Sequence, residues 1–111
     1  MLALGIAAAA AVPASAGSAE PVKKTVKVLD DYFTPIKLKV PRKSRIVWKW
    51  DAYNGNTHDV KLKSGPDGVK KFHSDPATAE FTFKRTLYKR GKYVVICTYH
   101  RTVMQQTIVV K

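Results

Sequence analysis

The chain is poor in cysteine and in negative charge. Cys97 is its single cysteine, so an internal disulfide is excluded and the thiol is free, paired with another chain or bound to something else. Eight Asp and Glu stand against twenty Lys and Arg, which gives a formal net charge of +12. Such a field attracts acidic partners or anionic surfaces and carries no information about the fold. The length of 111 residues predicts one globular domain and excludes a multidomain enzyme.

The first 19 residues also contain no charged side chain. Their apolar run, followed by small residues around Ala16, is typical of a secretory signal peptide and its cleavage site. We therefore predict a signal peptide over residues 1–19, cut near Ala16 or Ala19, and a mature domain over residues 20–111. An uncleaved anchor helix is the alternative, but Pro13 and the weakly apolar alanines make a poor membrane span. The prediction places the domain in the periplasm, the cell envelope or the extracellular space.

The remainder of the chain has the pattern of short β-strands. Apolar and polar residues alternate with period two, and the runs are separated by turns rich in Asp, Asn, Gly and Pro. Segment 93–97 is continuously apolar, as expected of a central strand buried on both faces. No stretch has convincing helical periodicity, although residues 76–80 are compatible with one irregular or helical turn. Seven or eight short strands in one domain predict an all-β sandwich of two sheets. The alternating runs contain Val26 and Val28; Ile36, Leu38 and Val40; Ile46, Trp48 and Trp50; Val60 and Leu62; Phe81 and Phe83; and Ile108 and Val110.

Three kinds of metal-binding side chain lie close together near the C-terminus. Cys97, His100 and Met104 follow the apolar segment within one predicted loop, at one end of the sandwich. A second imidazole, His58, lies far upstream, after the turn at residues 54–56. Two histidines, one thiolate and a long axial methionine form the ligand set of a blue-copper electron-transfer site.

Copper suits this set better than zinc. Thiolate and imidazole bind both Cu(I) and Cu(II), and the soft thioether favours the reduced ion. A structural zinc site needs four strong ligands, whereas Met104 is a weak one. A rigid β scaffold also limits ligand movement when an electron arrives. Because no third residue orients a Cys97–His100 pair for nucleophilic catalysis, we do not expect an enzyme.

With His58 upstream of Cys97-x2-His100-x3-Met104 on a β-rich domain, the sequence resembles the cupredoxins, in particular the plastocyanin and amicyanin group. The resemblance covers Val22 to Lys111 and extends to the DYFTP motif that begins at Asp31 and the GKY motif that begins at Gly91. It implies an eight-stranded Greek-key β-sandwich and one type 1 copper ion bound by His58, Cys97, His100 and Met104. It also implies a one-electron carrier in which His100 is the partly exposed edge where electrons enter.

Three features depart from the family pattern. Met104 follows His100 after three intervening residues, a spacing between those of amicyanins and plastocyanins. Asp59 follows the upstream histidine where plastocyanins usually have Asn, and an anionic side chain there changes the hydrogen bonding that steadies the ligand loop. Proline is missing beside His100, which is flanked by Tyr99 and Arg101. We therefore expect the same ligands in a differently tuned site.

Other noticeable side chains are interpreted as structural or as partner contacts. His73 is predicted to be a surface residue that has no matched partner and does not bind the metal. Trp48 and Trp50 share one strand face and are predicted to lie in the core, with a role as electron relays as the alternative. Arg101, beside His100, is expected to contribute to partner docking.

The basic residues mostly alternate with apolar ones, which is typical of a solvated sheet face. Nucleic acid is not an expected partner, because no recognised binding motif with interleaved aromatic residues is present. We expect a monomer steered toward an acidic redox protein, with retention at an anionic membrane or envelope surface as a further expectation. Two alternative functions remain open. One is copper delivery, storage or resistance with the same ligands, and the other is adhesion by a metal-free cationic sandwich.

Overall fold

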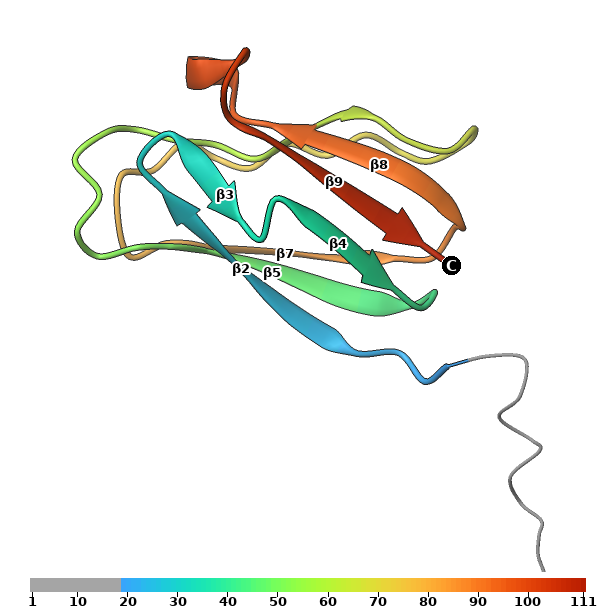
Figure 1. The fold of residues 1–111 in the computed structure, drawn as a ribbon. Helices are drawn as coiled ribbons and strands as arrows, with labels where there is room; N and C mark the ends of the chain where they lie inside the picture. Colours follow the sequence, from blue (N-terminus) through green and yellow to red (C-terminus); the bar gives the residue numbers. More distant parts are fainter. Residues whose placement is uncertain (1–18) are drawn as a thin grey trace, which may run out of the picture.

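The computed structural model describes residues 19–111, so the predicted signal peptide lies outside the described residues except for its last position. Eight strands in this part form two four-stranded sheets, packed against each other (Figure 1). The strands are β2 (Lys23–Leu29), β3 (Tyr32–Thr34), β4 (Lys37–Val40), β5 (Ser44–Trp50), β6 (Lys61–Ser64), β7 (Thr82–Leu87), β8 (Gly91–Ile96) and β9 (Gln105–Val110). The all-β two-sheet prediction is confirmed.

The strand order crosses between the sheets in the manner of a Greek key. One sheet has the order β3-β2-β5-β7, and the other has the order β4-β9-β8-β6. Strands β2 and β5 run parallel, as do β4 and β9, while the remaining pairs are antiparallel. Parallel neighbours need long crossover connections, and these carry the chain from one sheet to the other.

The core lies between the sheets and follows the alternation in the sequence. Trp48 and Trp50 on β5 are completely or almost completely buried, which confirms their prediction as core residues. The indole N–H of Trp48 donates to Oε1 of the buried Gln106 on β9 at 3.0 Å, so the two sheets are joined by a hydrogen bond as well as by apolar contact. Strand β8 lies between β9 and β6, as the apolar segment 93–97 predicts.

One open prediction is decided and one prediction is wrong. Of the irregular or helical turn expected at residues 76–80, the structure has the irregular form, because residues 78–80 are bends and the backbone of Ala77 pairs in both directions with that of His58 in an isolated β-bridge. Ile36 precedes β4 and is 59% exposed, so it is not part of the alternating core face. Within residues 19–111 the structure has one short 3-10 turn, η2 (Thr98–His100), and no helix there has the length and hydropathy needed to span a membrane.

Candidate metal centre

The structure brings three of the four predicted ligands together at one end of the sandwich. One donor atom from each of His58, Cys97 and His100 lies within 4.8 Å of the other two. The Cys97 sulfur lies 3.9 Å from Nδ1 of His58 and 3.7 Å from Nδ1 of His100. Both rings therefore present the same nitrogen to the thiol.

The loop after β8 is folded back on itself by backbone hydrogen bonds. Cys97 directly follows β8, and the turn η2 carries His100 round so that its N–H donates to the Cys97 carbonyl at 3.2 Å. The N–H of Met104 donates to the His100 carbonyl at 2.9 Å, and the N–H of Cys97 donates to the Met104 carbonyl at 3.1 Å. Met104 is fully buried within the core cluster. The three residues therefore belong to one closed loop.

His58 comes from a separate segment, between β5 and β6, and is fixed there by backbone contacts. Its backbone forms the bridge with Ala77, and its carbonyl accepts the indole N–H of Trp50 at 3.2 Å. The side chain is fully buried, whereas that of His100 is 26% exposed. Only His100 of the two imidazoles therefore has an edge at the surface.

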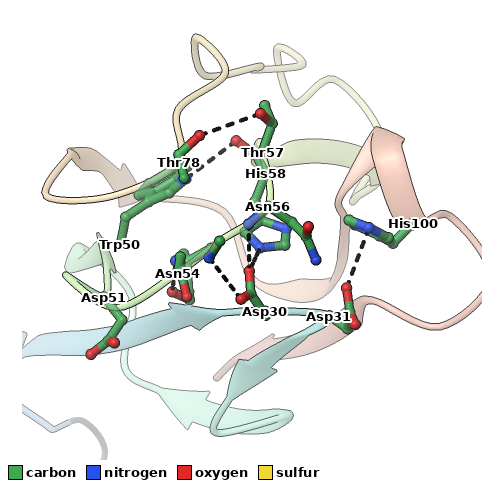
Figure 2. A network of polar contacts seen from close by, with 12 residues as sticks. Asp30, Asp31, Trp50, Asp51, Asn54, Asn56, Thr57, His58, Thr78 and His100 are labelled. Carbon is green, nitrogen blue, oxygen red and sulfur yellow. Dashed lines mark hydrogen bonds and ion pairs between the residues drawn. The ribbon is translucent and has the colours of Figure 1, made fainter.

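Each imidazole also meets a carboxylate at its remote nitrogen, and both carboxylates come from the turn between β2 and β3 (Figure 2). Nε2 of His58 lies 2.8 Å from Oδ1 of Asp30, and Nε2 of His100 lies 3.3 Å from Oδ1 of Asp31. The backbone N–H of Gly55 and the side chain of His58 hold the pKa of Asp30 below its ordinary value. From the sequence, Asp30 and Asp31 were interpreted as turn residues, with Asp31 also at the start of the DYFTP motif, and no contact with the ligands was predicted. Two adjacent acids in a strongly basic chain are the feature that could have indicated such a contact.

Asp59 connects the two segments that carry ligands. Its Oδ1 accepts the Thr98 N–H at 2.6 Å, and its Oδ2 contacts the Thr98 hydroxyl at 2.6 Å and Nε2 of His73 at 2.7 Å. Burial alone raises the pKa of Asp59, but the hydrogen bonds from His73 and Thr98 outweigh it and leave the pKa below its ordinary value. His73 lies outside the donor cluster, as predicted, but the prediction that it has no partner is wrong.

The thiol of Cys97 is completely buried, and burial raises its pKa above the ordinary value. The protein without metal therefore keeps a neutral thiol at pH 7. A metal ion at this position replaces the thiol proton, since the thiolate is the form that binds metals.

The donor set fits copper. Two imidazole nitrogens and one sulfur converge, and the cluster found among residues 19–111 contains no fourth His, Cys, Asp or Glu of the kind a structural zinc site would use. The neighbouring Asp30 and Asp31 are engaged with the remote nitrogens of the rings. Three strong ligands, and the buried Met104 on the same closed loop, are consistent with a type 1 copper site.

Comparison with known proteins also indicates a copper-binding protein. Residues 21–111 match the family described as copper binding proteins of the plastocyanin/azurin family. A halocyanin from Natronomonas pharaonis is 33% identical over 70 residues, which are 62% of this chain and 41% of that protein. The chain thus spans less than half the length of this relative.

Solved structures share the fold at lower identity. The amicyanin of Paracoccus versutus matches with a TM-score of 0.67 and 20% identity, over 84% of this chain and 83% of that chain. A copper-containing nitrite reductase from Thermus scotoductus matches with a TM-score of 0.69 and 24% identity, over 89% of this chain and 26% of that chain. The predicted resemblance and the predicted fold are both confirmed. The chain belongs to the plastocyanin/azurin family of copper-binding proteins.

Proposed function

We propose that the chain is an exported, monomeric type 1 copper protein that carries one electron at a time between larger redox proteins and is not itself an enzyme. The supporting observation is the buried Cys97 sulfur between the Nδ1 atoms of His58 and His100, at 3.9 and 3.7 Å. In this proposal the Cys97 thiolate and the two histidines would hold the copper ion, and Met104 would be a weaker fourth ligand. Copper would supply the one-electron couple.

The surroundings of the ligands suit electron transfer. His58 is held by a backbone bridge, and the loop from Cys97 to Met104 is closed by its own hydrogen bonds. Ligands fixed in this way move little when the charge of the ion changes, and this keeps the reorganisation energy low. The partly exposed edge of His100 is the proposed point of electron entry and exit.

The charge distribution supports an acidic redox partner. The three ion pairs in residues 19–111 all join a histidine to an aspartate, and no Lys or Arg there pairs with a carboxylate of the same region. The basic side chains therefore keep their full field toward solvent, which steers an acidic protein toward the chain. Export is proposed from the uncharged apolar leader, as is access to an anionic envelope surface.

The visible absorption spectrum of the purified chain tests the site. We expect an intense thiolate-to-copper band when the reduced protein is loaded with one equivalent of Cu(II). Cys97→Ala should abolish the band and Met104→Ala should shift it, while the control Asp75→Asn should leave it in place because Asp75 is exposed and lies outside the cluster. A colourless wild-type protein, or copper bound equally well by Cys97→Ala, would contradict the proposal.

A second measurement separates electron transfer from copper handling. An electron carrier should show fast electron self-exchange and should retain Cu(I) in the presence of a competing chelator. Slow self-exchange together with ready release of Cu(I) would favour delivery or storage instead.

A further inference from the structure

The turn between β2 and β3 carries two adjacent carboxylates that lie against the two imidazoles of the metal centre. Figure 2 shows Asp30 below the His58 ring and Asp31 below the His100 ring. The ring nitrogens concerned are the Nε2 atoms, which do not face Cys97. One short segment of the chain therefore contacts both rings.

Asp30 is integrated into the structure by both of its oxygens. Oδ1 contacts Nε2 of His58 at 2.8 Å and accepts the N–H of Asn56 at 3.0 Å, and Oδ2 accepts the N–H of Gly55 at 2.8 Å. The carboxylate thus joins the β2–β3 turn to the segment that leads into His58. The Asp30 carboxylate therefore fixes both the His58 ring and the backbone at residues 55–56, just before His58.

Asp31 occupies the left-handed backbone region, with a φ of 72°. Glycine is the residue most readily accommodated there, and asparagine and aspartate follow. The carboxylate is 56% exposed, yet its Oδ1 lies 3.3 Å from Nε2 of His100. The turn could form equally well with an uncharged residue, so the charge is not required by the backbone.

The pairing of Asp30 and Asp31 with histidines is informative because acidic side chains are scarce in this chain. The chain has eight Asp and Glu and twenty Lys and Arg, so an exposed carboxylate has many cations available to it. Within residues 19–111, however, every ion pair is made with a histidine. Two of the three aspartates concerned are Asp30 and Asp31, and both contact rings of the donor cluster.

We propose that Asp30 and Asp31 form a carboxylate clamp that orients both imidazoles through Nε2, and that Asp31 lowers the reduction potential of copper bound at the site. The inference rests on the proposed function and adds Asp31 as a positioning residue for His100. A carboxylate that accepts the remote N–H, as Asp30 is placed to do for His58, fixes the tautomer and the ring orientation and makes the ligand more basic. Asp31 lies 3.3 Å from Nε2 of His100 as an ion-pair partner and favours a proton on that nitrogen through its charge and its oxygen. Its negative charge also favours the more highly charged copper ion, because the attraction grows with the charge of the ion.

Two substitutions of Asp31 separate its charge from the polar contact that its side-chain oxygen makes with His100. Asp31→Asn keeps an acceptor oxygen and removes the charge, whereas Asp31→Ala removes both. Asp75→Asn is the matched control, since Asp75 is exposed and its carboxylate accepts no hydrogen bond among the described residues. All three variants change the net charge by the same amount.

The first readout uses the protein without metal. In long-range ¹H–¹⁵N spectra of the imidazoles, His100 of the wild type and of Asp31→Asn should show one tautomer with the proton on Nε2. Asp31→Ala should show a mixture of tautomers, and Asp75→Asn should match the wild type. An unchanged His100 signature in Asp31→Ala would overturn the positioning role.

The second readout is the reduction potential of the copper-loaded protein. Asp31→Asn should lower the ratio of Cu(II) to Cu(I) affinity about tenfold, which raises the potential by about 59 mV for a one-electron couple. Asp75→Asn should change the ratio less than twofold. Equal shifts in the two variants would overturn the specific effect of Asp31. If the wild type forms no copper–thiolate band, the proposed function fails, while the spectra of the metal-free protein still decide whether the clamp exists.

Discussion

Asp59 and Thr98 are joined by two contacts of 2.6 Å, one from the Thr98 N–H and one from its hydroxyl. Asp59 directly follows His58 and Thr98 directly follows Cys97, so the pair links two ligand segments that are distant in the sequence. The carboxylate is almost completely buried. This link maintains the position of the Cys97 sulfur relative to the His58 ring.

Asp59→Ala should therefore weaken the fold around the metal centre. Hydrogen bonds to charged groups contribute about 1.5–3 kcal/mol each, and the substitution leaves the Thr98 N–H without its acceptor. We expect the free energy of unfolding of the metal-free protein, measured with guanidinium chloride, to fall by about 2–4 kcal/mol. Asp75→Ala, at an exposed position, should change it by less than about 0.5 kcal/mol. Equal losses in the two variants would mean that the Asp59–Thr98 link does not stabilise the folded chain.

The same carboxylate should make stability depend on acid pH. The pKa of Asp59 is lowered in the folded chain, so the unfolded chain binds more protons in the interval between the folded and the unfolded pKa. This contribution is present above the unfolded pKa of about 3.9 and is lost as the pH falls through the folded value. Between pH 5 and pH 2, Asp59→Asn should lose less of its free energy of unfolding than the wild type. Parallel pH profiles would contradict the lowered pKa.

The buried Cys97 thiol should make the stability of the metal-free protein depend on alkaline pH. Burial raises the pKa of its thiol, so the stabilising contribution is present below the unfolded pKa of about 8.5 and is lost as the pH rises through the folded value. The free energy of unfolding of the metal-free wild type should decline more steeply between pH 8 and pH 10 than that of Cys97→Ala. Alkylation by iodoacetamide at pH 7 should also be slow until the chain unfolds, because the buried thiol is neutral. Rapid alkylation of the folded protein would show that the thiol is accessible.

The Trp48–Gln106 hydrogen bond between the sheets gives a prediction about the core. Gln106→Ala leaves the buried indole N–H of Trp48 without an acceptor, and it also removes the amide that donates to the Pro35 carbonyl at 2.8 Å. An unsatisfied buried group costs about 1–3 kcal/mol, and the small cavity adds to this. Thermal unfolding should therefore occur at a clearly lower temperature. The variant Ile108→Val, on the same buried face of β9, should lose only about 0.5–1.5 kcal/mol.

Strand positions followed from the sequence because they depend on local pattern. The alternation in segments such as Val26–Val28 and Ile46–Trp50 coincides with β2 and β5, since side chains on a strand point alternately to opposite faces. Ile36 lies just before β4 and is exposed, which the period-two pattern of the sequence does not reveal. The choice between an irregular and a helical turn at residues 76–80 also lies outside the local pattern. The backbone of Ala77 is paired with that of His58, which is distant in the sequence.

The donor types were also evident from the sequence. Cys97, His100 and Met104 share one loop, and their chemistry indicates copper regardless of the exact geometry. Asp59 was singled out from the sequence as a residue that alters the hydrogen bonding of the ligand loop, and it does contact Thr98, but the other contacts of the carboxylates around the site were not evident. Asp30 and Asp31 have the sequence signature of a turn, and Asp59 and His73 are separated by a loop, so nothing local predicts that they meet.

The sequence by itself thus determined the β class, the basic charge and the chemical identity of the donors, because periodicity, composition and side-chain chemistry are properties of the chain. Only the tertiary structure decided that His58 meets Cys97 and His100, that Asp59 ties Thr98 in place and that the β2–β3 turn reaches both rings. These contacts depend on how the strands cross between the two sheets. The way the strands cross is fixed by burial of the whole core between the two sheets. No single segment of the sequence determines that burial by itself.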